Sequence, residues 1–328
     1  MARKPQPPDY RLLARVGRMY YEQGLKQEEI AEKLHISRPK VSRLLRQAQE
    51  EGIVQISVIS PPGIHADLEE RLEQTFGLVE AVVVDVPGGA APGEVNRLIG
   101  TVAAEYLART VEEGDLIGVS WGQTLQAMAN ALPPTPTGKV EVVQIIGGLG
   151  PASAEVHSMS ICRRLARALD GESILLPAPG IVDSPQVKEI LLSDSHVQAA
   201  MQRFPALNVA YVGVGAPTPA SVVMRGGEII SQVELDQLIQ FGAVGDIALR
   251  FYDIHGAPVT SEIDERVIGI SLDQLKRIPR VVGVAGGPLK VHTILGALRG
   301  ELLNVLVTDS DTAAKILELE QASASVSV

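Results

Sequence analysis

The chain has 328 residues, 45% of them hydrophobic and 3% aromatic, and a formal net charge of −10 at pH 7. Its length suits one large core with a small module beside it, and its many Val, Ile, Leu and Ala residues suit an α/β domain with buried parallel strands. With no apolar run long enough to span a membrane, no secretory leader and Cys162 as its single cysteine, the sequence excludes a membrane-spanning protein and an intrachain disulfide. It predicts a cytoplasmic protein.

The charge is divided unevenly along the chain. Residues 1–60 hold eleven Lys or Arg and seven Asp or Glu, a net charge of +4, whereas residues 61–328 carry −14. A basic head on an acidic body is typical of a DNA-binding protein whose body repels DNA. The stiff break Ser60-Pro61-Pro62-Gly63 is a natural boundary, so we expect a DNA-binding domain over 1–60 and a larger domain over 61–328.

Three helices are predicted in the head. The first spans residues 9–23, and Gly24 ends it. Its expected buried side consists of Leu12, Leu13, Val16 and Tyr20. Residues 27–51 then form two short helices joined by a tight turn, with the apolar stripe Ile30, Ala31, Leu34, Val41, Leu44, Leu45 and Ala48. His35 lies in the turn, where a positive φ is needed, and histidine tolerates that conformation better than most residues.

The third helix carries a basic outer face. Ser37 precedes it and is placed to cap its free N–H groups, and Pro39 lies in its first turn. Arginine makes bidentate contacts to guanine, and Lys and Ser reach phosphates, so this face suits the DNA major groove. The predicted DNA-binding residues are Gln27, Ser37, Arg38, Pro39, Lys40, Ser42, Arg43 and Arg46. The alternative is the solvated face of an ordinary helical hairpin, and the agreement of spacing, cap and charge favours DNA binding.

A strand is predicted at the end of the head, because residues 53–59 alternate apolar and polar side chains as a half-buried strand does. The head is therefore predicted to be a winged-type helix-turn-helix domain.

The body shows the pattern of an α/β fold. Beyond residue 63, apolar runs alternate with amphipathic segments, as in a doubly wound parallel sheet. Strands are predicted at 78–86, 115–120, 140–146, 172–176, 207–214, 247–252, 280–285 and 303–308. Helices are predicted at 66–76, 93–111, 122–131, 155–169, 185–203, 233–240, 288–299 and 310–319, before a frayed tail.

Glycine-rich turns follow four of these strands, at 120–124, 147–150, 213–215 and 286–290. Ligands of open α/β sheets bind at the carboxyl ends of the strands, and a glycine turn before a helix binds phosphate through free N–H groups. Each turn alone is weak evidence, because tight connections need glycine in any case. Together, with donors on Ser120, Gln123 and Thr124 and a positive charge on Lys290, they predict an anion site.

Segments spread over the head and body carry a resemblance to a known family. They are YYEQGLKQEEIAEKLHISRPKVSRLLRQAQEEGIVQISV, LIGVSWGQTL, VVQIIGGLG, LPAPGIVDSP, YVGVG, GDIALRFYDIHGAPV and VAGGPLKVHTILGALRGELLNVLVTD. In these segments the chain resembles the SorC (SorC/DeoR-type) sugar-binding transcriptional regulators. The resemblance implies a DNA-binding head and an effector domain similar in fold to phosphosugar isomerases and deaminases. It also implies operator DNA and a phosphorylated sugar as partners, and a homo-oligomer, either a dimer or a tetramer.

The resemblance also implies an effector site. Its residues are Ser120, Gly122, Gln123, Thr124, Gly147, Gly148, Asp246, Gly286, Gly287 and Lys290, with Trp121, His157 and Arg225 as weaker candidates. Asp246 is expected to accept hydrogen bonds from sugar hydroxyls. Many relatives have WGTT where this chain has WGQT, so the phosphate contacts or the ligand differ here. Some relatives hold the sugar through a lysine Schiff base, but Gln144-Ile145-Ile146 contains no lysine, so noncovalent binding without metal or cofactor is expected.

Two functions are compatible with these observations. The favoured one is a transcriptional regulator of carbohydrate metabolism whose operator binding responds to a phosphorylated sugar. The alternative is a phosphosugar isomerase- or deaminase-like enzyme, which would need a positioned base and an acid partner. The turns contain no closely spaced acid–base pair, and an enzyme would leave the basic head unexplained.

Overall fold

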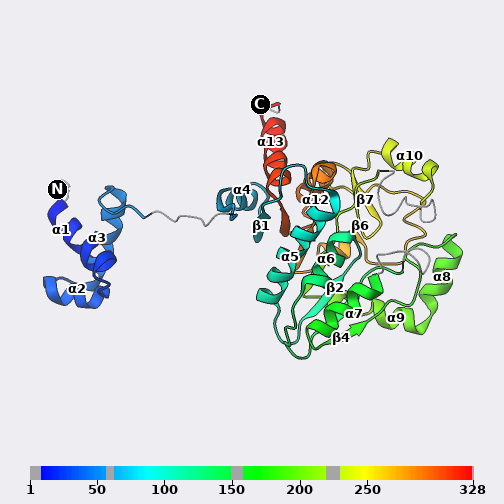
Figure 1. Ribbon diagram of the computed structural model, residues 1–328, viewed down its shortest axis with the longest axis horizontal. Coiled ribbons are helices and arrows are strands. Elements are labelled where there is room, and N and C mark those ends of the chain that lie inside the picture. The colour runs from blue at the N-terminus through cyan, green and yellow to red at the C-terminus, as the bar shows by residue number, and fades with distance from the viewer. Residues whose placement is uncertain (1–8, 57–62, 149–157, 219–229, 327–328) are drawn as a thin grey trace, which may run out of the picture. The chain divides into compact units, whose positions relative to one another are not determined.

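The computed structural model describes residues 9–56, 63–148, 158–218 and 230–326. The chain divides into two compact units, residues 1–61 and 62–328, each with its own core. Figure 1 shows the helices of the first unit at the blue end of the colour scale and the mixed helices and strands of the second from cyan to red. Within the described residues, no helix combines the length and apolar character that crossing a membrane requires.

The smaller unit is a bundle of three short helices. They are α1 (Tyr10–Gly17), which continues as the π-helical turn η1 (Arg18–Glu22), then α2 (Gln27–Leu34) and α3 (Arg38–Glu50). Their core consists of Val16, Met19, Ile30, Ala31, Val41 and Leu45, with Leu12, Leu25, Leu34, Ile36 and Leu44 packed against it. Tyr20 is exposed and Met19 is buried, so the prediction for Tyr20 is wrong. The wider π-helical turn rotates the buried face by about one residue.

The turn and the end of α3 show how local sequence shapes this unit. His35 has φ 52° and ψ 44°, the left-handed conformation predicted for it. Ser37 occupies the position before α3, but among the described residues its side chain makes no capping hydrogen bond. Residues 53–56, the described part of the predicted strand, form no strand. The Val54 N–H instead donates to the Ala48 carbonyl oxygen, which folds the chain back onto α3.

The larger unit is built on a parallel sheet in the order β1-β9-β8-β5-β2-β3-β4. The strands are β1 (Glu80–Val84), β2 (Leu116–Val119), β3 (Glu141–Gln144), β4 (Glu172–Ile174), β5 (Val209–Val212), β8 (Arg280–Val284) and β9 (Val305–Asp309). Every adjacent pair in this sheet is parallel, which confirms the predicted doubly wound architecture. After β2 the chain moves outward to β3 and β4 and then returns to β5 on the other side of β2. The junction between β2 and β5 is therefore the switch point of the sheet.

Helices fill the connections between the strands. They are α4 (Ala66–Phe76), α5 (Pro92–Thr110), α6 (Gln123–Ala131), α7 (Ser158–Ala168), α8 (Pro185–Ser193), α9 (Ser195–Met201), α10 (Gln232–Gln240), α11 (Leu272–Leu275), α12 (Val291–Arg299) and α13 (Ser310–Val326), with 3-10 turns η2 (Phe204–Ala206) and η4 (Pro288–Lys290). The predicted helix 185–203 is split at Asp194, whose side chain accepts from the His196 and Val197 N–H groups and so starts α9. The helix α13 runs past residue 319 to Val326, where we expected a frayed tail, and the Arg299 side chain contacts Glu320 and Ser323.

The predicted strand 247–252 is not part of the sheet. It covers the last residue of β6 (Gly245–Ile247), the turn and all of β7 (Arg250–Tyr252), which together form an antiparallel hairpin. Ala248 and Leu249 make the turn with φ values of 53° and 60°, a conformation that strand propensity does not reveal. This hairpin carries Asp246 in its first strand.

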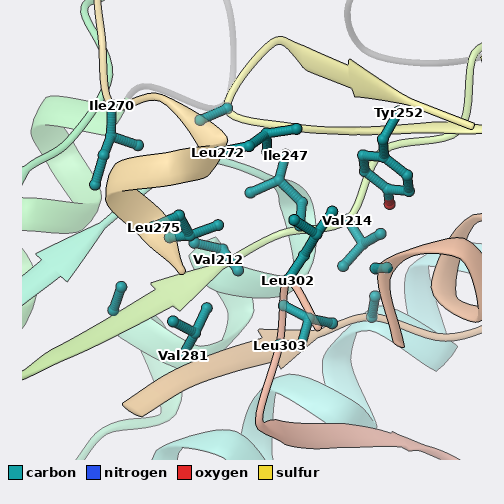
Figure 2. Packing of buried hydrophobic residues seen from close by; sticks show 14 of the residues in the cluster. Val212, Val214, Ile247, Tyr252, Ile270, Leu272, Leu275, Val281, Leu302 and Leu303 are labelled. Atoms are coloured by element: carbon teal, nitrogen blue, oxygen red, sulfur yellow. The ribbon is translucent and has the colours of Figure 1, made fainter. Parts of the chain in front are cut away.

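The central strands β2, β5, β8 and β9 are buried on both faces, so the sheet separates two cores. One face packs against α5, α6 and α7 through residues such as Ile99, Leu125 and Ile161. The other packs against α4, α12, α13 and the β6–β7 hairpin. Figure 2 shows Val212 and Val214 beside Ile247 and Leu302 in this second core. The hairpin is thus fixed by apolar packing close to the end of β5.

Candidate functional site

A cavity of about 510 Å³ lies at the carboxyl ends of the central strands. Its described lining comes from the segments that follow β1, β2, β5 and β8, and from the β6–β7 hairpin. These residues are Ala90, Pro92, Val95, Asn96, Trp121, Gly122, Gln123, Thr124, Gly213, Val214, Gly215, Ala216, Thr218, Asp246, Ala248, Gly286, Gly287, Pro288, Leu289 and Lys290. The cavity therefore lies at the switch point, where open α/β sheets bind ligands.

The turn between β2 and α6 forms one wall. Gly122 has φ 142°, which favours glycine, and among the described residues no side chain caps α6 after it. The N–H groups of the first turn of α6 have no partner within the helix and are therefore available to an anion. A Cβ atom on Gly213 would lie 2.8 Å from the Trp121 carbonyl oxygen, so glycine allows β5 to approach this turn closely.

The turn between β8 and α12 forms the opposite side and carries Lys290. The Gly287 N–H donates to Asp309 Oδ2 at 2.7 Å and to Thr312 Oγ1 at 2.9 Å. A Cβ atom on Gly286 would lie 2.2 Å from Asp309 Oδ2, so only glycine fits there. These contacts tie the turn to the end of β9 and place Lys290 in the cavity wall.

Asp246 lies in the cavity wall with 4% of its surface exposed. Its backbone pairs with Gly215 in both directions, at 2.9 and 3.0 Å, and its Oδ2 accepts from the Leu249 N–H at 3.2 Å. Burial raises the pKa of Asp246 to about 6, against the opposing effects of that hydrogen bond and of the Lys290 charge. Burial likewise lowers the pKa of Lys290, which the Asp246 charge partly offsets. The site thus has free N–H groups and the Lys290 ammonium at one end and a buried carboxyl group, a hydrogen-bond acceptor when ionised, at the other.

The structure brings most of the predicted effector residues together. Seven of them line the cavity: Gly122, Gln123, Thr124, Asp246, Gly286, Gly287 and Lys290. The weaker candidate Trp121 lines it as well. Ser120 is buried beside the cavity, and its Oγ accepts from the Gly213 N–H at 3.1 Å, so it supports the turn.

Gly147 and Gly148 are not among the described lining residues, and they pack against residues 178–180 instead. They follow β3, which lies on the far side of β2 from the switch point. Leu149, Gly150, His157 and Arg225 lie outside the described residues.

Sequence reasoning missed the contribution of residues 90–96. Val95 and Asn96, from the first turns of α5, line the cavity beside α6. The Asn96 Nδ2 donates to Gln123 Oε1 at 3.1 Å, and Thr124 Oγ1 donates to Asn96 Oδ1 at 3.0 Å. No sequence signal marks this residue, because a single asparagine in a helix is typical of an exposed surface.

The predicted DNA-binding surface is exposed on the smaller unit. Val41 and Leu45 point into its core, which turns the polar side of α3 outward. The exposed residues are Ser37, Arg38, Pro39, Lys40, Ser42, Arg43 and Arg46, while Gln27 is half-buried at the start of α2. The Arg38 Nε atom lies 2.8 Å from Glu28 Oε1, an exposed ion pair of small energy. The helix α3 therefore presents four basic residues on a solvent-facing side.

Comparisons with known protein families match both units. The family model for a sugar-binding domain (Sugar-bind) matches residues 61–318, and the model for a homeodomain-like domain matches residues 8–56. The chain is 37% identical over 300 residues to the deoxyribonucleoside regulator of Bacillus subtilis (strain 168), covering 92% of this chain and 95% of that protein. It is 34% identical over 316 residues to the sorbitol operon regulator of Klebsiella pneumoniae, covering 94% and 98%.

Solved structures show the same likeness. The crystal structure of the full-length sorbitol operon regulator SorC from Klebsiella pneumoniae matches with a TM-score of 0.72 and 33% sequence identity. The match covers 94% of this chain and 99% of that one, so both the head and the body have counterparts there.

Proposed function

The chain belongs to the SorC family of sugar-binding transcriptional regulators, and from this premise we propose that a phosphorylated sugar in its cavity controls how its head binds operator DNA. The observation that carries this proposal is the cavity at the switch point. It combines the uncapped start of α6 and the Lys290 ammonium with the buried carboxyl group of Asp246. A phosphate group and sugar hydroxyls are the chemical groups that such a combination recognises.

The sugar part of the proposal rests on the division of the cavity into two polar ends and an apolar wall. Free N–H groups at a helix start and a lysine ammonium favour a phosphate. Asp246 accepts from hydroxyls, and Trp121 and Val214 supply the apolar surface that the faces of sugar rings pack on. We propose that the ligand is held noncovalently by these groups.

The DNA part rests on the exposed basic side of α3. Arg43 and Arg46 lie on that side with Lys40, one and two turns into the helix. We propose that α3 enters the major groove, with arginines reading base edges and Lys40 contacting phosphate. A single head of low net charge binds DNA weakly, because phosphate contacts supply much of the affinity.

Regulation then requires paired heads. We propose that the larger unit forms a homo-oligomer, a dimer or a tetramer, that holds two heads at half-sites separated by whole helical turns. A sugar phosphate that binds one arrangement of this oligomer more tightly than another shifts the spacing of the heads and so the operator affinity. The proposal places the protein in the cytoplasm, where its DNA lies.

We propose that the cavity binds its ligand without converting it. Asp246 and Lys290 are the titratable residues among its described lining, and an isomerase would need a base and an acid partner there. Such an enzyme would have no use for a DNA-binding head, and the relatives are named as regulators. Turnover of a sugar phosphate by the wild-type chain, lost in Asp246→Asn with binding retained, would contradict this.

The test measures DNA binding by the full chain with and without sugar phosphates. DNA fragments are first selected from a random pool by the wild-type protein, and their affinity is then measured by fluorescence anisotropy. Arg43→Ala should weaken binding by about tenfold or more, the loss expected for one bidentate base contact of ~1–3 kcal/mol. Arg277→Ala removes an exposed arginine from the larger unit and should change DNA affinity little.

Lys290→Met should abolish the response to the sugar phosphate while leaving ligand-free DNA binding intact. A panel of sugar phosphates that bind the protein and leave operator affinity unchanged would overturn the proposed regulation. Equal DNA affinity of Arg43→Ala and the wild-type chain would overturn the proposed use of α3.

A further inference from the structure

The Asn96 side chain connects α5 to the first turn of α6 inside the cavity wall. It makes the two hydrogen bonds that join it to Gln123 and Thr124, at 3.1 and 3.0 Å. All three side chains line the cavity, and Thr124 is buried while the other two are half-buried. The two residues that follow the Gly122 turn are therefore held by a third residue from another helix.

The packing of α5 on α6 fixes where Asn96 stands. Gly100 lies one helical turn after Asn96 on the same side of α5. A Cβ atom on Gly100 would lie 2.6 Å from Ala127 Cβ and 2.7 Å from the Met128 nitrogen, so the two helices are in backbone contact there. Because this close contact prevents α5 from sliding along α6, the position of Asn96 relative to the start of α6 is fixed.

The direction of each hydrogen bond determines what remains for a ligand. An asparagine amide has an oxygen that only accepts and a nitrogen that only donates. Since Gln123 Oε1 accepts from Asn96, the NH₂ group of Gln123 is the part left to face the cavity. Since Thr124 gives its single hydroxyl hydrogen to Asn96, the Thr124 oxygen can only accept from a ligand.

We propose that Asn96 is a positioning residue that sets the hydrogen-bonding polarity of the effector site. It makes Gln123 a donor to the anionic group and Thr124 an acceptor for a hydroxyl of the same ligand. The inference rests on the proposed phosphate site and deepens it. The site accordingly selects an ionised phosphate monoester that carries a nearby hydroxyl group. Thr124 is then not a phosphate donor, which reverses the donor role that the sequence predicted for it.

The first test is the isosteric change Asn96→Asp, with inorganic phosphate as the probe and the fluorescence of Trp121 in the full chain as the signal. The new carboxylate still accepts from Thr124, but it cannot donate to Gln123, so the Gln123 carbonyl oxygen turns toward the anion. Phosphate affinity should fall at least tenfold, as expected for the loss of a hydrogen bond to a charged group. Asn130→Asp is the matched control, because Asn130 is exposed on α6 and pairs only with Gln126 in the described structure.

The second test separates positioning from a merely structural role. In Asn96→Ala the Thr124 hydroxyl is released and becomes able to donate to phosphate. The effect of Thr124→Val on phosphate affinity should therefore be about fivefold larger in the Asn96→Ala background than in the native one, the size of one ordinary hydrogen bond. This cycle compares the wild type, the two single variants and the double variant, so it does not depend on how Asn96→Asp folds.

The outcomes are distinguishable. A wild-type chain that shows no saturable response to phosphate overturns the proposed phosphate site and this inference with it. A wild-type chain that binds phosphate, with the same affinity in Asn96→Asp, overturns the role of Asn96 alone. Equal effects of Thr124→Val in the two backgrounds do the same, because they show that Asn96 does not hold the Thr124 hydrogen.

Discussion

Replacing Asp246 by asparagine should make the ligand-free protein more stable near neutral pH and should lower its affinity for the sugar phosphate. The carboxyl group is buried in the cavity wall, where its charged form is poorly solvated. Asparagine has nearly the same shape, keeps an oxygen to accept from the Leu249 N–H, and carries no charge. The substitution therefore removes a group that costs stability and whose oxygens would accept from sugar hydroxyls.

The size of the effect follows from the raised pKa of Asp246. Its pKa is about 6 in the folded protein and 3.8 for an ordinary aspartate, a difference of about two units. At ~1.4 kcal/mol per unit, the charged carboxylate costs up to about 3 kcal/mol of stability. Above pH 6 the group is charged in both the folded and the unfolded state, so the whole cost is present. Below pH 3.8 it is neutral in both states, and the cost is absent.

The free energy of unfolding of the full chain can be followed through Trp121, its single tryptophan, which lies in the cavity wall. Asp246→Asn should exceed the wild type by roughly 1–3 kcal/mol at about pH 7.5, and the attraction to Lys290 is already contained in this figure because it is part of the pKa shift. The difference should shrink strongly at about pH 4.5. Asp236→Asn, an exposed substitution on α10, is the control and should show a small difference at both pH values.

A difference between Asp246→Asn and the wild type that does not change between the two pH values would refute the reasoning. It would mean that Asp246 has the same pKa in the folded and the unfolded chain, and therefore that its burial does not raise the pKa.

Three further substitutions test local features of the structure. Gly215→Ala would place a Cβ atom 2.0 Å from Asp246 Oδ1, so it should lower the free energy of unfolding by ~1–3 kcal/mol and weaken the binding of sugar phosphates. The control Gly88→Ala, with open space around it, should change neither stability nor binding. His35→Gly should stabilise the smaller unit by up to ~1 kcal/mol, seen as slower amide exchange in α2 and α3, because φ is 52° there; faster exchange would speak against the left-handed turn. Leu45→Ala should cost the same unit ~2–4 kcal/mol and abolish DNA binding. Since the larger unit has its own core, the unfolding transition reported by Trp121 should not move, and a shift would contradict the independence of the two units.

The sequence by itself determined most of the helices and the strands of the parallel sheet. Helical spacing gave the three helices of the head, because one apolar stripe per helix is enough to bury its side in a small bundle. Apolar runs between glycine turns predicted the strands of the sheet. The strands β1, β2, β3, β4, β5 and β8 lie within their predicted ranges, and β9 ends one residue beyond its range. The site residues next to Gly122 and Gly286 were also predictable, since a strand, a glycine turn and a helix form a local unit.

The order of the strands was decided by the tertiary structure. Residues 147–150 have the same local pattern as 120–124, yet β3 lies away from the switch point and Gly147 and Gly148 pack elsewhere. Residues 247–252, next to Asp246, were predicted as one strand of the sheet, and they belong instead to a hairpin, because two consecutive left-handed residues reverse the chain.

Asn96 shows most clearly what only the folded chain decides. It joins the site because α5 and α6 touch at Gly100, and a contact between two helices is not encoded in either one alone. The Gly122 turn and the free N–H groups at the start of α6, which suit an anion, could be predicted from the local sequence. The direction in which Gln123 and Thr124 offer their hydrogen bonds depends on a neighbour 27 and 28 residues away in the sequence, and so on packing.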